Sequence, residues 1–348
     1  MKIVLDDISG KNNLYPFTAT RSVADIRVGI LTIREKWEKL LDRKIDTISE
    51  LTLNDSESKE VEQISANIIP SQQWLNAFLL RQNITDKNLE YPWHIFQNND
   101  MALREDFELV CSGRTSALVS STNKLVASEN IFSEEGAVME HCILNATEGP
   151  IYIGKNALVM EGCLIRGPVA ICEGSVVKMG TKIYGATTIG PYCMAGGEIK
   201  NSVLFSYSNK AHDGYLGDSV IGEWCNLGAG TSNSNIKNTA GIVKVWVQDN
   251  NEYLPAGIKC GLLIGDYSRT AINTSFNTGT VVGVCCNIFS EGFPPKYIQH
   301  FSWGQEEYKL EKALLDIDNW KKLKGKTITP EEIKILTDIY YSQKISNA

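Results

Sequence analysis

The 348-residue sequence has no apolar run of about eighteen residues, the length needed to cross a bilayer. Its first residues, MKIVLDD, lack the basic and apolar stretches of a secretion signal. With 43% hydrophobic and 22% charged residues, its composition is that of an ordinary soluble globular protein. We therefore expect a cytoplasmic protein that has no membrane partner.

Cysteine pairs and basic clusters are also missing. The nine cysteines are scattered, and no two of them are separated by two residues, so we predict no zinc or other metal site and no disulfide framework. Reduced cysteines acting as small core residues fit this distribution. The net charge of −7 argues against nucleic acid as a partner, because a phosphate backbone needs a concentrated basic surface. Any anionic ligand must meet a local group of lysines.

A six-residue repeat occupies the middle of the chain. From Ile153 an aliphatic or small residue returns at every sixth position: Ile153, Val159, Ile165, Ile171, Val177, Ile183, Ile189 and Ala195. Small residues follow four positions after most of these, as in Ala157 and Cys163. This period predicts a left-handed parallel β-helix with three flat sides, in which the aliphatic residue points inward and the small residue packs at a corner. Successive coils would stack about 4.8 Å apart.

Two breaks interrupt the repeat. The first covers about residues 197–214, and the second covers about 232–260. Apolar and polar residues alternate over 242–248 within the second break, which predicts a strand and a turn leading out of the solenoid. Insertions in solenoids form surface loops, often on the binding face.

The fold that we predict has three parts. Residues 1–130 form a truncated α+β domain, 131–296 the hexapeptide-repeat left-handed β-helix, and 297–348 a C-terminal helical extension. Helical periodicity predicts helices over 24–41, 72–81, 305–323 and 330–341. We expect the last helices to cap the open end of the coil stack, where strand edges would otherwise be unpaired.

Chemistry-bearing residues gather at the first break. His212 is the residue there whose ordinary pKa suits proton transfer near neutrality, so it could take a proton from an amine or hydroxyl that attacks a thioester. Lys200 and Lys210 would meet phosphate charge, and Asn226 and Asn235 would bind sugar hydroxyl or amide groups. The alternative is structural: a surface histidine, solvated lysines and turn-forming asparagines.

Residues 198–235 resemble the acetyltransferase half of the GlmU family, which acetylates glucosamine-1-phosphate and then makes UDP-N-acetylglucosamine. The matching segments are Ile199-Lys200-Asn201, Lys210 with His212 and Tyr215, and Asn226 to Thr231 followed by Asn235. The resemblance implies acetyl-CoA as co-substrate, an amino-sugar-1-phosphate as acceptor, and a homotrimer with each active site between neighbouring prisms.

The resemblance also implies roles for individual residues. His212 would be the catalytic base, and Lys200 and Tyr215 would contact the sugar phosphate. Asn226 and Asn235 would position the substrate. The family's upstream phosphate-binding arginine falls near Lys182 by spacing, which keeps the charge but loses the bidentate fork. Coils from Ile264 onward would correspond to the acetyl-CoA wall.

The N-terminal part resembles sugar-1-phosphate nucleotidyltransferases over residues 14–21 and 28–33. The family's G-x-G-T-R loop, which holds nucleotide phosphates, is replaced by residues 7–13. Acetyl transfer from acetyl-CoA to an amino-sugar-1-phosphate is therefore the predicted function. Two alternatives stay open: a sugar-1-phosphate nucleotidyltransferase that makes a UDP- or dTDP-sugar with Mg²⁺, and a non-catalytic solenoid that binds a nucleotide sugar or a partner protein.

Overall fold

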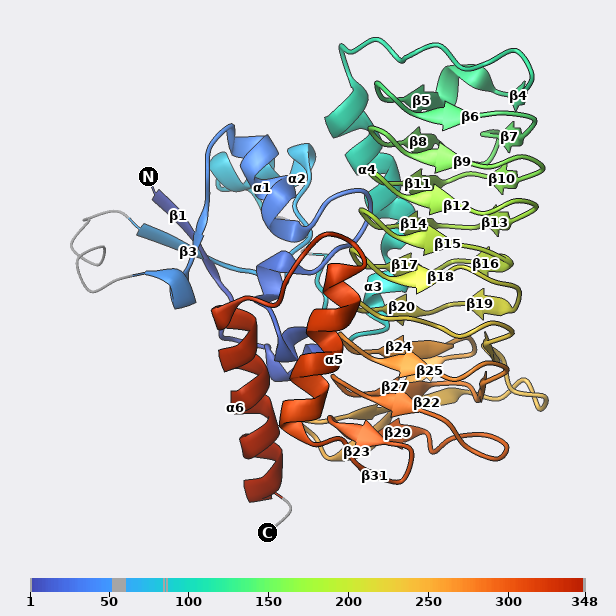
Figure 1. Cartoon of the computed structure of the whole chain (residues 1–348). Coiled ribbons are helices and arrows are strands. Elements are labelled where there is room, and N and C mark those ends of the chain that lie inside the picture. Colours follow the sequence, from blue (N-terminus) through green and yellow to red (C-terminus); the bar gives the residue numbers. More distant parts are fainter. Residues whose placement is uncertain (1, 52–60, 84, 86, 347–348) are drawn as a thin grey trace.

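The computed structural model describes residues 2–51, 61–83, 85 and 87–346. It contains a small α/β domain, a tall parallel β-solenoid and two C-terminal helices (Figure 1). In the described part of the chain, no helix combines the length and apolar character that crossing a membrane requires.

Three parallel sheets form the sides of the solenoid, which we call the first, second and third sides. The first side consists of β4 (Lys124–Val126), β7 (Ile143–Asn145), β10 (Leu164–Arg166), β13 (Lys182–Tyr184), β16 (Glu198–Lys200) and β19 (Tyr215–Gly217). The second side consists of β5 (Ile131–Ser133), β8 (Ile151–Ile153), β11 (Val169–Ile171), β14 (Thr187–Ile189), β17 (Val203–Leu204), β20 (Val220–Ile221), β24 (Leu262–Ile264), β27 (Thr280–Val282) and β29 (Tyr297–Ile298). The third side begins with β6 (Val138–Met139), β9 (Leu158–Val159), β12 (Val176–Val177), β15 (Met194–Ala195) and β18 (Asn209–Lys210). It continues through Asn226 to β25 (Arg269–Thr270), β28 (Asn287–Ile288) and β30 (Ser302–Trp303).

The six-residue repeat builds the core of this solenoid, as predicted. The eight repeat positions at every sixth residue from Ile153 to Ala195 are each at most 2% exposed. Equivalent residues lie above one another in the parallel ladders, for example Ile165, Ile183 and Ile199. All nine cysteines are buried, several of them in this core. The ladders run from Lys124 to Trp303, so the solenoid extends beyond the predicted 131–296 at both ends.

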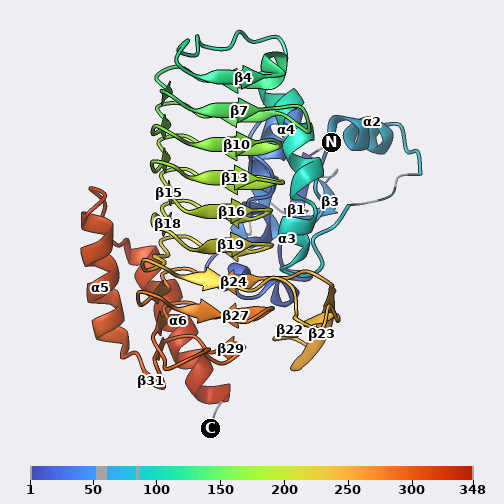
Figure 2. The ribbon, with the colours of Figure 1, turned by 90° about the vertical axis from the view of Figure 1, so that its right-hand side faces the viewer.

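The N-terminal domain covers the second side of the solenoid. Strands β11, β14, β24 and β27 are buried on both faces, whereas β10 on the first side alternates between exposed and buried residues. Helix α4 (Asn99–Cys111) runs along the second side (Figures 1 and 2). Its Asn99 Nδ2 donates to the carbonyl of Ala186 at 2.6 Å. The described N-terminal residues therefore leave the outer face of β10 on the first side exposed.

The N-terminal domain is built on a small parallel sheet. Its strands β1 (Lys2–Asp6), β2 (Asp46–Thr47) and β3 (Val61–Ser65) pair in the order β2-β1-β3. Helix α2 (Gln72–Leu79) agrees with the predicted 72–81, and a short α3 (His94–Gln97) precedes α4.

Helix α1 (Ile33–Leu41) starts nine residues later than the helix predicted over 24–41. The prediction was therefore wrong for the first half of that range. The chain turns sharply at Gly29, whose φ is +81°, a value that favours glycine. Asp106 accepts hydrogen bonds from the backbone N–H groups of Ile30 and Leu31 and holds the turn from a distant helix. The helix begins only after this turn, with a capping box at Thr32 and Glu35.

The second break forms an antiparallel hairpin that leaves the solenoid, which confirms the predicted strand and turn. Strand β22 (Val243–Val247) pairs with β23 (Glu252–Gly257). The shorter strands β21 (Ser232–Asn233) and β26 (Ser275–Phe276) flank this insertion and pair with each other.

The C-terminal helices α5 (Leu310–Lys322) and α6 (Pro330–Ser346) lie along the flank of the lower coils (Figure 2). The expectation that they cap the open end of the stack was therefore wrong. One corner of successive coils carries aromatic side chains, including Tyr207 and Trp224 stacked at 4.3 Å, and the helices bury Ala313 and Ile317 against this corner. Strand β31 (Glu306–Glu307) instead pairs antiparallel with β30, the last strand of the third side, and forms a hairpin with it.

Candidate functional site

His212 lies on an exposed corner between the third and first sides of the solenoid. Its loop connects β18 to β19, and the imidazole makes no hydrogen bond to a described residue. The buried Lys210 fixes this loop, because its Nζ donates to the carbonyls of Gly196 at 3.1 Å and His212 at 2.5 Å. Burial lowers the pKa of Lys210 to about 8, although the nearby Asp213 opposes this shift. The loop backbone is held while the imidazole stays accessible.

Glycines surround the loop in the coils above and below. A Cβ at Gly196 would lie 2.4 Å from the carbonyl oxygen of Ala211, and one at Gly197 would lie 2.9 Å from that of His212. Below, a Cβ at Gly214 would lie 2.1 Å from the carbonyl of Thr231. The loop therefore packs backbone against backbone, and Gly196 and Gly197 offer no side chain that could cover the imidazole.

A second histidine shows what is particular about this corner. His141 occupies the same corner four coils higher, in the loop from β6 to β7, and it is also exposed. The strands beside it present Val138 and Ile143, which are 50% and 42% exposed. His212 instead lies between strands that present polar residues, Asn209 on the third side and Tyr215 on the first.

A hydrogen-bond network lies where the His212 loop enters β19 on the first side. The Nδ2 of Asn235 donates to the hydroxyl of Tyr215 at 3.1 Å and to Asp218. Asn201 Nδ2 donates to the other carboxylate oxygen of Asp218 at 2.6 Å. Burial, with the negative charge of Asp218, raises the pKa of Tyr215 to about 12, so the phenol keeps its proton and can donate to a ligand.

Asp218 and Asn201 are site residues that sequence reasoning missed. Asp218 is 4% exposed and orients two amide groups, one from the coil above and one from the coil below. Asn201, Asp218 and Asn235 are each seventeen residues apart, which is one coil. This coil-length spacing of polar residues was the signal that could have found them.

Two of the three lysines predicted to meet phosphate charge, Lys200 and Lys182, lie on the first side above this network. The prediction was wrong for Lys210, which is buried and bonded to backbone carbonyls. Lys200 pairs in register with Tyr184 and Gly217, and its Nζ is 5.4 Å from the centre of the Tyr184 ring. Lys182 pairs in register with Glu198 instead, so it lies in a different row from Lys200. Only sixteen residues separate Lys182 from Glu198, and this short coil moves the register by two positions relative to an eighteen-residue spacing.

Asn226 lies around the corner, on the third side. It bridges the ladder between Asn209 and Arg269, and its side-chain oxygen accepts from Asn209 Nδ2 at 3.4 Å. The structure therefore brings Lys200, Tyr215 and Asn235 together and leaves Asn226 on a separate face, with the His212 loop between them.

The nucleotidyltransferase-like segment at residues 14–21 is used to dock the N-terminal domain on the solenoid. Arg21 donates to the buried Asp266, lies 3.4 Å from Glu223, and stacks 5.0 Å from the Phe205 ring. Thr20 donates to the same carboxylate of Asp266 at 2.5 Å. These side chains are engaged with the solenoid rather than with an open nucleotide site.

The loop that replaces the phosphate-binding glycines is closed on itself. The side chain of Asp6 accepts hydrogen bonds from the backbone N–H groups of Ile8 at 3.0 Å and Ser9 at 3.1 Å. Amides of this kind hold phosphate oxygens in nucleotide-binding loops, and here they are already bonded. Among the described residues no group of three or more His, Cys, Asp or Glu side chains is arranged to hold a metal ion.

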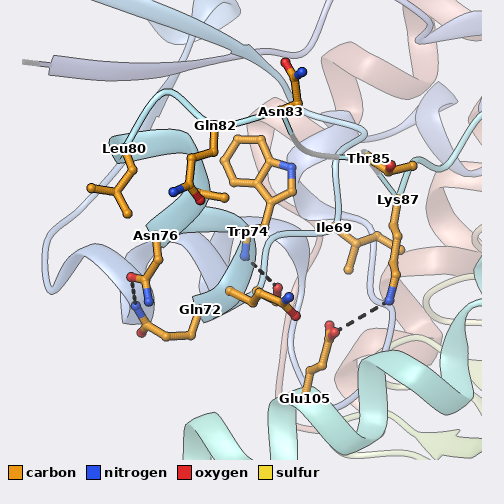
Figure 3. Close-up of a pocket in the computed structure, with 13 residues that line it drawn as sticks. Ile69, Gln72, Trp74, Asn76, Leu80, Gln82, Asn83, Thr85, Lys87 and Glu105 are labelled. Carbon is orange, nitrogen blue, oxygen red and sulfur yellow. Dashed lines mark hydrogen bonds and ion pairs between the residues drawn. The ribbon is translucent and has the colours of Figure 1, made fainter.

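Two cavities formed by described residues do not include His212 in their walls. A cavity of about 770 Å³ in the N-terminal domain is bounded by α2 and the segment that follows it, with Gln72, Trp74, Asn76 and Gln82 in its wall (Figure 3). None of the predicted site residues lines it. A groove of about 340 Å³ lies on the first side and includes Lys182 and Tyr184.

The fold and this corner define a hexapeptide-repeat β-solenoid that carries a reduced α/β domain on one side. Residues 2–85 match a family model described as sugar nucleotidyl transferase. The chain is 31% identical over 120 residues to the bifunctional protein GlmU of Methanocaldococcus jannaschii, which covers 34% of this chain and 27% of that relative. It is 32% identical over 152 residues to a bifunctional sugar-1-phosphate nucleotidylyltransferase/acetyltransferase of Sulfurisphaera tokodaii, covering 38% and 37%.

These matches confirm the predicted resemblance to the GlmU-like bifunctional proteins. The chain spans only 27% and 37% of the length of the two curated relatives. A solved hexapeptide transferase family protein from Anaplasma phagocytophilum aligns over 66% of this chain and 90% of that chain, with 13% identity and a TM-score of 0.19. A TM-score this low supports no argument about the present fold, which follows from its own strand ladders.

Proposed function

We propose that this protein transfers an acetyl group from acetyl-CoA to the amine of an amino-sugar phosphate at the His212 corner. The observation that carries the proposal is the accessible imidazole between two polar rows, at a corner whose loop is fixed by Lys210. The names of the relatives support an acetyl-transfer role in sugar nucleotide synthesis.

In the proposed step the amine nitrogen of the sugar attacks the thioester carbonyl carbon of acetyl-CoA. A C–N bond forms, the C–S bond breaks, and the thiolate of CoA leaves. His212 takes the proton that the nitrogen loses, and this proton, or one from water, neutralises the thiolate. General-base catalysis of this kind contributes about 10²- to 10⁴-fold to a rate.

The remaining residues would position the acceptor. Lys200 would neutralise phosphate charge, and Tyr215 would donate its phenolic proton to a phosphate or hydroxyl oxygen. The amide of Asn235, oriented by Asp218, would bind a sugar hydroxyl. Fixed partners of this kind act mainly by holding the reacting atoms close together.

We also propose a homotrimer in which neighbouring solenoids complete each site. Asn226 lies on the third side and Tyr215 on the first. For both to contact the same bound acceptor and acetyl-CoA, one of them has to come from a second copy of the chain. Exposed apolar side chains on the third side, such as Val138 and Met194, are consistent with a buried contact. Sedimentation equilibrium would give the mass of three chains, and a monomer would contradict this part of the proposal.

The test is thiol release from acetyl-CoA with a panel of amino-sugar phosphates that includes glucosamine-1-phosphate, with mass spectrometry of the product. An N-acetylated sugar phosphate formed with one thiol per turnover is the expected result. Thiol release that does not depend on any amino sugar would contradict the proposal.

The second candidate is nucleotidyl transfer by the N-terminal domain, which the family model over residues 2–85 favours. The bonded amides of the residue 7–13 loop and the engagement of Arg21 with Asp266 weigh against it. Pyrophosphate release from a nucleoside triphosphate, a sugar-1-phosphate and Mg²⁺ would support this candidate. A third reading, binding of nucleotide sugar without catalysis, predicts no change in any rate when His212 is replaced.

A further inference from the structure

The groove on the first side of the solenoid has no role in the proposed acetyl transfer. It has a volume of about 340 Å³ and is lined mainly by β10 and β13, with Asn145, Arg166, Lys182 and Tyr184 as its polar members. Ile143 and Leu164 form its upper, apolar part and are both more than two-fifths exposed. It belongs to the side of the solenoid that the N-terminal domain leaves free (Figure 2).

The groove continues the row of residues that runs upward from Lys200. Arg166 pairs in register with Tyr184, and Tyr184 pairs in register with Lys200. Arg166 therefore lies two coils above Lys200, roughly 10 Å away at a strand spacing of about 4.8 Å. Lys182 lies on the coil between them. Three cations thus follow one another on successive coils of a single face, in a staggered line that leads away from the His212 corner, because Lys182 lies in the neighbouring row.

Two acidic side chains lie near this line. One is already hydrogen-bonded to a tyrosine, and the other is held only by an exposed ion pair. Glu198 accepts the hydroxyl proton of Tyr184 at 2.6 Å, and this hydrogen bond raises the pKa of Tyr184 to about 12. Glu148 lies 3.3 Å from Arg166, and both side chains are more than half exposed. Exposed ion pairs contribute little, so a phosphate can replace Glu148 as the partner of Arg166. Its guanidinium can then bind a phosphate through two parallel hydrogen bonds.

An amino-sugar-1-phosphate would occupy only the lower end of this line. Its single phosphate would reach Lys200 and leave Arg166, Lys182 and the apolar surface at Ile143 and Leu164 without a role. A diphosphate joined to a nucleoside has a second phosphate for the upper cations. It also has a flat base for the exposed aliphatic side chains beyond them.

We propose that the acceptor is an amino sugar carried on a nucleoside diphosphate. Its diphosphate lies along Lys200, Lys182 and Arg166, and its base packs on Ile143 and Leu164. The amine of the sugar then faces the His212 corner. This assignment of the acceptor rests on the proposed acetyl transfer, whereas the nucleotide groove itself does not.

The groove is tested by binding of UDP, measured by calorimetry on the full-length protein without acetyl-CoA. Arg166→Ala and Lys182→Ala should each weaken UDP binding at least tenfold. Lys155→Ala removes an exposed lysine from a different corner and should leave the affinity within twofold. No UDP binding by the wild type, or equal affinities in all four proteins, would overturn the groove assignment.

The acceptor is tested by comparing kcat/KM for UDP-glucosamine and glucosamine-1-phosphate. We expect the UDP-linked sugar to be preferred at least tenfold, and Arg166→Ala to remove this preference by raising its KM. A preference for the 1-phosphate, or an equal loss for both acceptors in Arg166→Ala, would overturn the assignment. If neither acceptor is acetylated while UDP binding still depends on Arg166, the proposed acetyl transfer fails and the nucleotide groove is upheld.

Discussion

His300 makes the stability of this protein sensitive to mild acid. The residue follows β29 at the lower end of the solenoid, and its Nδ1 accepts the backbone N–H of Val284 at 2.8 Å. The ring lies edge-on to Tyr15, with 5.0 Å between the ring centres. Burial lowers the pKa of His300 to about 4, and protonation would also place an N–H group against the N–H of Val284.

The direction of the effect follows from the two pKa values. In the unfolded chain the histidine pKa is about 6.5, so between pH 6.5 and 4 the unfolded chain binds the proton and the folded protein does not. The stability that depends on keeping His300 neutral is fully present above pH 6.5 and is lost as the pH falls toward 4. At pH 5.0 the two pKa values correspond to a loss of about 2 kcal/mol in the free energy of unfolding relative to pH 7.5.

Urea unfolding at pH 7.5 and pH 5.0 measures this loss, with His300→Asn as the matched control. The asparagine oxygen can accept the Val284 N–H group but does not titrate, so the effects of all other groups cancel between the two proteins. The wild type should lose about 2 kcal/mol more than His300→Asn between the two pH values. Equal losses in both proteins would refute the assignment of a neutral His300 that accepts the Val284 N–H group.

Three further predictions concern the interface, the core and the site. Arg21→Met leaves Asp266 and Glu223 without their cation and should cost about 3–5 kcal/mol in urea unfolding, whereas an unchanged midpoint would show that Arg21 does not secure the domain interface. Ile183→Ala opens a cavity between neighbouring coils and should cost about 2–5 kcal/mol, and a loss below 1 kcal/mol would contradict a packed aliphatic stack. Asp218→Asn removes the carboxylate that orients two amides, so KM for the acceptor should rise about tenfold with kcat changing less, whereas a change in kcat alone would contradict a positioning role.

The solenoid could be predicted because its information is local and repeated. Each six-residue unit places one aliphatic side chain inward, so a single misassigned residue does not obscure the pattern from Ile153 to Ala195. The segment with His212 drew attention because the six-residue period fails over 197–214, although the coils continue through it as β16, β17 and β18. The role of Lys182 was harder to place because coil length varies, and two residues fewer in one coil change the row in which a side chain falls.

The misplaced elements depend on partners far away in the sequence. The start of α1 is set by Asp106, which holds the turn at Gly29 from 76 residues beyond Ile30. The C-terminal helices lie on the flank because aromatic residues such as Trp224 line one corner, a ladder visible only after the coils are stacked. Arg21 also depends on a distant partner. The sequence of residues 14–21 does not indicate that its side chain binds Asp266.

We propose that His212 accepts the proton from the attacking amine. The direct test of this role is kcat for thiol release at saturating acceptor. His141→Ala is the matched control, because His141 is exposed on the same corner four coils higher. The account predicts that His212→Ala lowers kcat by about 10²- to 10⁴-fold while acceptor affinity stays within about twofold, and that His141→Ala leaves kcat unchanged. Equal kcat values for the wild type and His212→Ala would contradict it.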